Sequence, residues 1–307
     1  MLGKRYEYQD PTFLRLLKLV NENIRLLGSP MVSIYNVFPF MGFLPGDHRT
    51  ILNNVDEIIS FIRTEFIKSL KRLDANDQRS FIDVFLVKQK EEQPHANMYF
   101  HNDNLVSVVR NLFSAGMETT STSLRWGLLL MMKYPGVQKK VQEEIEQVLG
   151  SAQAKYEHRK EMPYTDAVVH ETQRFANILP MSLPHETAAD VNFKGYFIPK
   201  GTHVTPLLAS VLQDESHFEK PKEFYPEHFL DSEGNFVKNE AFMPFSAGRR
   251  VCAGETLAKM ELFLFFTSLL QKFTFRLPPG VIDVDLTPAV GFTTPPMPHL
   301  ICALPRS

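Results

Sequence analysis

Apolar residues recur with the 3.6-residue period of an α-helix through most of the first half of the chain. The clearest helix covers residues 11–27 and opens with Asp10-Pro11, a capping residue followed by proline at the first helical position. Residues 31–45 are expected to form an aromatic linker broken by prolines. The same period predicts further helices over 48–73, 80–90, 102–133, 164–177 and from Pro135 to a stop at Gly150.

The pattern changes after residue 178. Residues 191–198 and 202–208 are predicted to form a β-hairpin that turns at Pro199-Lys200-Gly201. Residues 214–247 have no period, and a loop of that length is usually functional. A strongly apolar helix is expected over 253–271, and the tail from Phe273 predicts short strands and turns. The fold class is therefore mainly α with small β-sheets.

Composition narrows the class of protein. Hydrophobic residues make up 44% of the 307 and charged residues 22%, and a net charge of -2 gives no electrostatic footprint for nucleic acid. Two cysteines, Cys252 and Cys302, predict no disulfide framework and favour a reducing compartment. Cys302 lies in the apolar run 299–304 and is expected to be a buried structural thiol. Neither a signal peptide nor a run of ~20 apolar residues occurs, and 262–270 is predicted to be a buried helix.

One cysteine lies in a setting suited to chemistry. The run Phe245-Ser246-Ala247-Gly248-Arg249-Arg250-Val251-Cys252-Ala253-Gly254 stands directly before a predicted helix. Free N–H groups at the helix start and nearby arginine stabilise a thiolate at Cys252, and the glycines let the backbone approach a flat ligand. The alternative is a buried cysteine in a glycine-rich loop.

A second pattern lies in the middle of the helix predicted over 102–133. Ala115-Gly116-Met117-Glu118-Thr119-Thr120 combines residues that are poor in helix interiors, so their presence asks for a reason. A glycine followed by an acid and a hydroxyl can form a groove for dioxygen with a proton supply. The alternative is a kinked helix with solvated polar residues.

A third pattern pairs Glu171 with Arg174, three residues apart on one helix face, where most such pairs are surface ion pairs of little energetic weight. Together the three patterns resemble the cytochrome P450 family. The cysteine loop matches its F-x-x-G-x-R-x-C-x-G motif at every fixed position. The runs 162–171 and 242–248 are similar to those of the microsomal family 2 enzymes. The resemblance covers nearly the whole chain.

The resemblance implies a role for each candidate residue. Cys252 would be the axial ligand of the haem iron. Phe245, Gly248, Gly254 and Ala115 would lie against haem, and Arg250 and His185 would reach its propionates. Thr119 and Glu118 would act in catalysis. An apolar substrate would contact the small or apolar side chains Ser114, Ala115, Leu179, Leu183 and Phe292, while Glu171, Arg174 and His228 would maintain the fold, His228 standing where the family motif has arginine.

The implied protein is a single cytochrome P450 domain over 1–307, helical to 178 and mixed over 179–307. It would be a haem-dependent monooxygenase that inserts one atom of O2 into an apolar organic substrate. Its electrons would come from an NADPH-dependent flavoprotein reductase and from cytochrome b5. The resemblance places it on the cytosolic face of the endoplasmic reticulum membrane, and residues 31–45 are apolar enough to enter a bilayer surface.

The resemblance also implies that the N-terminal part of the family, with its membrane anchor and W-x-x-x-R helix, is not in this chain, because Trp126 is followed by leucine at 130. The alternative function is therefore a truncated, non-catalytic isoform or fragment with poor haem binding. Other chemistries find no support, since G-x-G-x-x-G, P-loop, G-x-S-x-G and H-E-x-x-H motifs are all absent from the sequence.

Overall fold

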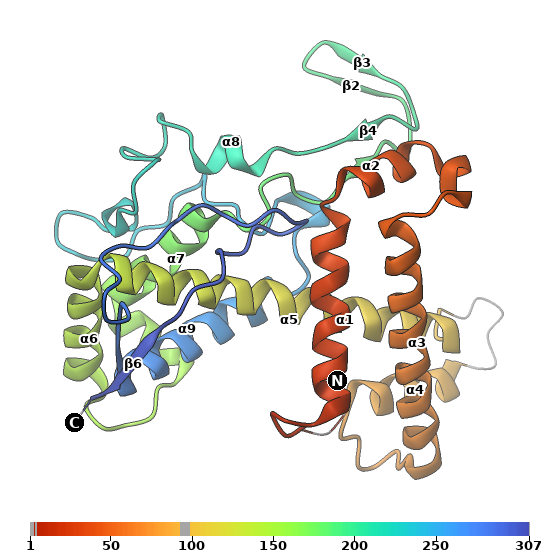
Figure 1. The fold of residues 1–307 in the computed structure, drawn as a ribbon, viewed down its shortest axis with the longest axis horizontal. Coiled ribbons are helices and arrows are strands. Elements are labelled where there is room, and N and C mark those ends of the chain that lie inside the picture. The colour runs from red at the N-terminus through yellow and green to blue at the C-terminus, as the bar shows by residue number, and fades with distance from the viewer. Residues whose placement is uncertain (1–2, 4, 93–98, 307) are drawn as a thin grey trace. The chain divides into compact units, whose positions relative to one another are not determined.

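A computed structural model describes residues 3, 5–92 and 99–306 of the chain (Figure 1). Its contacts form two compact units, Met1–Thr119 and Thr120–Ser307, which divide inside the long helix α5 (Asn102–Lys133). Over the described residues the fold is mostly helical with small antiparallel sheets, as predicted. No helix in this described part is long and apolar enough to cross a membrane.

The first unit is built from helices. They are α1 (Pro11–Leu27), α2 (Pro30–Val37), the 3₁₀-helix η1 (Pro39–Phe43), α3 (Asp47–Arg72), α4 (Phe81–Glu92) and the first part of α5. Asp10 caps α1 by accepting hydrogen bonds from the backbone N–H groups of Thr12 and Phe13. Helices α1 and α3 lie side by side (Figure 1). Their apolar faces share a core with α4 and α5 that includes Leu19, Ile62, Ile82 and Leu105.

The prediction of an irregular linker over residues 31–45 is wrong. Most of that segment is helical, in α2 and η1. Ser29 accepts a hydrogen bond from the N–H of Val32 and so caps α2, while Pro30 and Pro39 each occupy the first position of a helix. The prolines therefore start helices here instead of breaking them.

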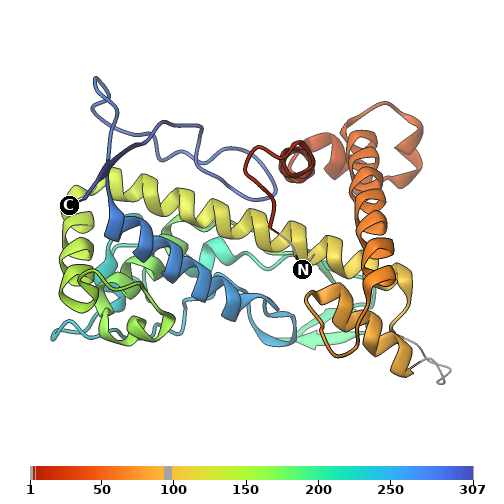
Figure 2. The same ribbon diagram turned by 90° about the horizontal axis from the view of Figure 1, so that it is seen from below.

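The second unit packs three helices around the C-terminal part of α5. These are α6 (Pro135–Leu149), α7 (Pro163–Ala176) and α9 (Glu255–Lys272), joined by η2 (Tyr156–Glu161) between α6 and α7 (Figure 2). A buried amide side chain connects α6 with α5 and with strand β5 (Phe273–Arg276). Gln138 of α6 donates to the carbonyls of Met131 and Phe275 and accepts from the Phe275 N–H at 2.7 Å. In 262–270, predicted to be a buried helix, Phe263 and Leu270 are fully buried but Phe265 is exposed.

The strands of the predicted hairpin pair differently in the structure. Strand β2 (Val191–Phe193) pairs with β3 (Tyr196–Ile198), and β4 (His203–Val204) pairs instead with β1 (His185–Glu186). The turn is at Lys194-Gly195, where both residues have positive φ, 49° and 86°. That conformation suits a two-residue hairpin turn, so the chain reverses five residues earlier than the Pro199-Lys200-Gly201 signal indicates.

The end of the chain forms a small sheet. Strand β5 (Phe273–Arg276) pairs antiparallel with β6 (Cys302–Pro305), which confirms the predicted short strands. Cys302 faces Arg276 across this pair and is half-buried, so the prediction of a buried thiol is wrong. A two-stranded sheet at the edge of the unit leaves part of the strand accessible.

Residues 214–247 are irregular as predicted, apart from the 3₁₀-helix η3 (Pro226–Phe229), and follow the short helix α8 (Leu208–Leu212), which the sequence did not indicate. The segment is nevertheless packed. Phe218 and Phe229 are fully buried against Ala167 of α7. Aromatic side chains thus hold this long loop on α7 without regular backbone hydrogen bonding.

Candidate haem-thiolate site

The cysteine loop is held by its own backbone. The Cys252 N–H donates to the Phe245 carbonyl at 2.9 Å, closing a loop that contains the 3₁₀-helix η4 (Gly248–Arg250). Ser246 and Gly248 adopt left-handed conformations, with φ of 64° and 72°. For serine this backbone is strained, and such strain gathers at functional sites. The loop shape therefore depends on a glycine at 248.

The thiol of Cys252 lies on the surface at the start of α9. Cys252 is exposed, and its carbonyl accepts from the N–H of Glu255, the first residue of that helix, at 3.2 Å. A Cβ added to Gly254 would come within 3.8 Å of the Cys252 sulfur, whereas one added to Gly248 would meet nothing. The glycines therefore leave open space on the loop that carries the sulfur.

The other predicted haem contacts in this unit are partly gathered here. Gly248, Arg250 and Gly254 are exposed on the cysteine loop, and Phe245 is half-buried beneath the Lys259 ammonium, 5.6 Å from its ring centre. His185 is half-buried on β1, a separate segment. One continuous stretch of chain thus offers a thiol, a guanidinium and glycine backbone on an accessible surface.

A buried ion pair lies on α7 of the same unit. Arg174 and Glu171 are both fully buried on α7, and the guanidinium donates to the carboxylate through two bonds of 2.7 Å. The three remaining N–H groups of Arg174 donate to the carbonyls of Leu212, Pro221 and Glu223 at 2.8–2.9 Å. All five donors of the arginine are therefore satisfied, and three of them hold the end of α8 and the segment that follows it.

The Glu171 carboxylate has two further partners. It accepts from the Tyr225 N–H at 2.8 Å and from Nδ1 of His228 at 3.2 Å. Nε2 of His228 accepts from the Lys220 N–H at 3.1 Å, so the partners require the neutral ring with its proton on Nδ1. Histidine here does what a donor-only arginine could not, because it also accepts a backbone hydrogen bond.

Aromatic contacts lead from α7 back to the cysteine loop. The His170 ring lies 4.7 Å from that of Phe236, 4.9 Å from Phe242 and 5.5 Å from Phe229. Its Nδ1 donates to the Asp166 carbonyl at 2.8 Å, which fixes the ring on α7. Phe242 stands three residues before Phe245, so this cluster anchors the start of the cysteine loop.

The Ala115–Thr120 pattern lies on α5, and Thr119 is the last residue of the first unit. Ala115 and Gly116 are exposed, and a Cβ added to Gly116 would meet nothing within 4 Å. The Thr119 hydroxyl donates to the Ala115 carbonyl at 2.8 Å, while Glu118 is 8% exposed. The helix continues through these residues without interruption, and its small side chains leave an open surface.

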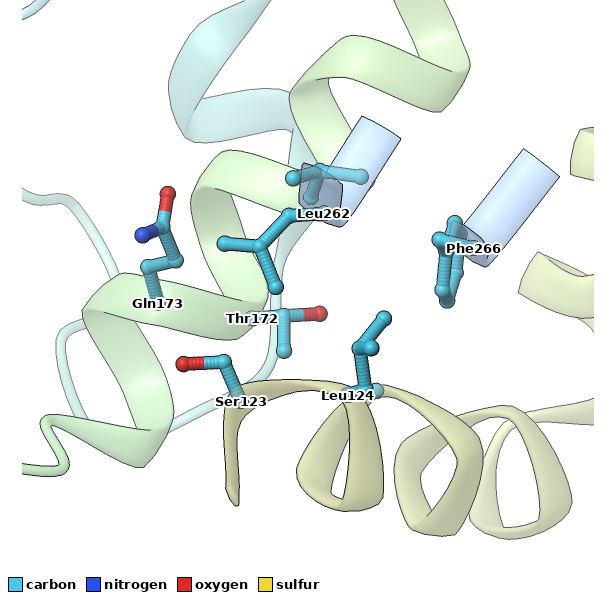
Figure 3. A pocket seen from close by; sticks show the side chains of 8 residues that line it. Ser123, Leu124, Thr172, Gln173, Leu262 and Phe266 are labelled. Carbon is cyan, nitrogen blue, oxygen red and sulfur yellow. The ribbon is translucent and has the colours of Figure 1, made fainter. Parts of the chain in front are cut away.

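The predicted substrate contacts are distributed over several segments. Ser114 is half-buried on α5, Leu179 and Phe292 are half-buried in loops of the second unit, and Leu183 is exposed. A cavity of about 10 Å³ lies between α5, α7 and α9, lined by Leu124, Thr172, Leu262, Phe266 and their neighbours (Figure 3). It has room for about one water molecule and cannot hold an organic substrate.

The cytochrome P450 family model matches residues 1–303. The chain belongs to the cytochrome P450 family. It is 55% identical to cytochrome P450 2K1 of Oncorhynchus mykiss, over 99% of this chain and 61% of the relative. Identity is 51% to cytochrome P450 2K6 of Danio rerio, with the same coverage, and 49% to cytochrome P450 2C5 of Oryctolagus cuniculus, over 98% of this chain and 62% of the relative.

Cytochrome P450 proteins bind haem, which agrees with the cofactor predicted from the cysteine loop. The resemblance to this family, and to its family 2 enzymes in particular, is confirmed. The chain spans about three fifths of the length of these relatives. The residues around Cys252 fit an iron porphyrin, since an accessible thiol stands beside open glycine backbone and an exposed arginine.

Sequence reasoning missed several contacts that hold the site. The carbonyls that receive Arg174 and the N–H groups of Lys220 and Tyr225 are backbone groups, which leave no sequence signal. The hydrogen bond of Trp126 was also missed. Its indole N–H donates to the Thr294 carbonyl at 2.9 Å, a contact that only the folded chain reveals.

Proposed function

We propose that this chain is the haem-binding part of a haem-thiolate monooxygenase, with Cys252 as the axial ligand of the iron. One observation carries the proposal: an exposed thiol stands on a loop closed by its own backbone, at the N-terminus of α9. A cysteine sulfur that is open to the surface can be reached by the iron of a flat cofactor. Membership of the cytochrome P450 family supports the same assignment.

Haem, when bound, would supply the iron at which dioxygen is activated, and thiolate ligation favours cleavage of the O–O bond. The protein's contribution is binding, orientation and proton supply. Phe245, half-buried below the Lys259 ammonium, would lie against the bound haem. Arg250 and His185 would bind the propionates. One oxygen atom would enter the substrate and the other would leave as water, with two electrons and two protons consumed.

Thr119 and Glu118 are proposed to handle those protons. The Thr119 hydroxyl donates to the Ala115 carbonyl and would lie beside the water molecules that carry these protons. Glu118, buried on the next face of α5, would connect that hydroxyl with a proton source. The substrate is proposed to be apolar, because Ala115, Leu179 and Phe292 offer it carbon surface.

The electron donor is proposed to be an NADPH-dependent flavoprotein reductase, with cytochrome b5 as a second donor. No dinucleotide or phosphate-binding motif occurs in these 307 residues, which supports an electron donor outside this sequence. The location of this chain is proposed to be the cytosolic face of the endoplasmic reticulum, by its resemblance to the microsomal family 2 enzymes.

Contact with the membrane surface is proposed for the α2–η1 segment. Val37, Phe40 and Phe43 are 69–75% exposed there. Such side chains gain free energy when they enter the acyl boundary of a bilayer. Phe40→Ser/Phe43→Ser should lower binding to phosphatidylcholine vesicles about tenfold, whereas Tyr99→Ser, an equally exposed aromatic of the same unit, should change it little. Equal effects of the two variants would contradict the assignment of the α2–η1 segment to the membrane surface.

Haem titration tests the ligand assignment. The wild-type chain should take up one equivalent of haem with a thiolate-type ferric spectrum, and Cys302→Ser should behave identically because Cys302 lies on β6. Cys252→Ser should lose that spectrum while keeping the helical circular dichroism of the wild type. Identical haem spectra for wild type and Cys252→Ser would show that another residue ligates the iron.

A chain that binds haem poorly is the second candidate. Leu257 and Phe265 of α9, the helix that follows the cysteine loop, are 58% and 54% exposed, and exposed apolar surface of this kind promotes self-association. Under this reading haem uptake would be substoichiometric, and the free chain would sediment as an oligomer. The same titration, followed by sedimentation, separates the two candidates.

A further inference from the structure

Thr294 joins three segments of the second unit. Its N–H donates to the Ile178 carbonyl at 2.9 Å, and its hydroxyl donates to the Asn177 carbonyl at 3.2 Å. Its own carbonyl accepts from the indole N–H of Trp126 at 2.9 Å. One residue therefore connects the end of α7, the C-terminal loop and α5 through all of its hydrogen-bonding groups.

The α5 side of this junction is rigid. Trp126 is 2% exposed and belongs to the main core of the unit, so its ring cannot follow a moving loop. Arg125, the preceding residue, donates to the Pro296 carbonyl at 3.2 Å. Figure 2 shows the C-terminal segment running along this part of α5. Two adjacent side chains thus fix the loop at both sides of Pro295.

Each loop at this junction carries a proposed substrate contact. Leu179 directly follows Ile178, and Phe292 stands two residues before Thr294. The first loop turns back through the Ser182 N–H to the Leu179 carbonyl at 3.0 Å. The second is closed at its base by the Ala289 N–H to the Pro295 carbonyl at 2.7 Å. Both loops are short and closed, so a shift at Thr294 would move the two side chains together.

We infer that Trp126 and Thr294 are positioning residues that set the separation of Leu179 and Phe292 and thereby the size of ligand the pocket selects. The inference rests on the proposed function for the ligand, but the mechanical coupling of the two loops is a property of this chain alone. The indole N–H of Trp126 is a donor that phenylalanine lacks, and tyrosine or histidine would present a donor at a different place.

Hydrogen exchange tests the coupling with or without haem. Trp126→Phe removes the indole N–H, and Thr294→Val removes only the hydroxyl. Each should raise the exchange rate of the amides of Ser182, Ala289 and Thr294 about fivefold, the effect of one lost hydrogen bond on local opening. The matched control is Gln142→Met, which loses buried bonds to the Leu270 and Phe273 carbonyls on another side of the unit and should leave these amides unchanged.

Faster amide exchange in the 288–296 loop without any change at Ser182 would overturn the coupling, as would an equal effect of Gln142→Met.

Ligand selectivity is measured on the haem-loaded chain, as the ratio of the dissociation constants of naphthalene and pyrene, which are detected by their shift of the haem absorption. Trp126→Phe and Thr294→Val should change this ratio at least about threefold in the same direction, and the control should not. A constant ratio with a normal haem spectrum overturns the inference on specificity, whereas absence of a haem spectrum contradicts the proposed function instead.

Discussion

The substitution Arg174→Lys tests how much the buried ion pair between Arg174 and Glu171 contributes to stability. Lysine keeps the positive charge but replaces a planar fork of five N–H donors with three donors on one nitrogen. Arg174 uses all five, two on Glu171 and three on backbone carbonyls. Because the side chain is fully buried, water cannot replace the lost donors.

The magnitude follows from the acceptors left without a partner. At least two of the five contacts must be lost, and a buried acceptor without a donor costs about 1–3 kcal/mol. The Glu171 carboxylate would also be less well paired, and breaking a buried pair typically costs about 3–5 kcal/mol. The expected loss in the free energy of unfolding is therefore about 3–5 kcal/mol.

Urea unfolding followed by Trp126 fluorescence measures this loss, because the only tryptophan lies in the same unit as Arg174. Arg306→Lys is the control. That side chain is 22% exposed and binds one carbonyl at 2.8 Å and Glu146 at 3.4 Å, so the change should cost about 1 kcal/mol or less. The double variant Glu171→Gln/Arg174→Gln should be less destabilised than the two single changes added together. Equal midpoints for Arg174→Lys and Arg306→Lys would refute the reasoning.

Three further predictions concern the same unit. Gly127→Ala should be less stable than Gly136→Ala by about 1–3 kcal/mol in thermal unfolding, because a Cβ at 127 would lie 3.2 Å from the Phe266 ring and one at 136 would meet nothing; equal stabilities would contradict this. Gln138→Met should lose about 2–4 kcal/mol in urea, since three buried backbone partners lose their bonds; a loss under about 1 kcal/mol would refute it. The hydrogen bond from Lys133 lowers the pKa of Asp283, so its stabilisation is present above the usual aspartate range and is lost as pH falls. The difference in Tm between wild type and Asp283→Asn should therefore be constant above about pH 5 and shrink progressively as the pH falls below the usual aspartate range, and a difference that stays constant down to about pH 2 would contradict the assignment.

The helices could be predicted from the sequence because their apolar period is strong and their ends are capped. The predicted bounds of α1 and α5 coincide with the observed ones, and those of α3, α4, α6, α7 and α9 differ by one or two residues. The 31–45 segment failed because proline marks both helix starts and breaks, and periodicity over eight residues cannot separate the two. The hairpin failed because Lys194-Gly195 is a weaker turn signal than Pro199-Lys200-Gly201.

The candidate site, too, could be predicted only in part from the sequence. Cys252, Gly248 and the Glu171–Arg174 pair lie in short contiguous patterns, where the residue types themselves indicate the chemistry. The partners of Arg174 and the junction at Thr294 join segments that are between 38 and 168 residues apart along the chain, largely through backbone carbonyls. Contacts of that kind follow from the packing of the whole unit and carry no local signal in the sequence.

Thiolate ligation of haem by Cys252 is tested most directly by the absorption spectrum of the reduced, haem-loaded chain under carbon monoxide. We predict a strongly red-shifted Soret band that is retained in Cys302→Ser and disappears in Cys252→Ser. A band at the position typical of histidine ligation, unchanged between Cys252→Ser and the wild type, would contradict the assignment of the cysteine loop.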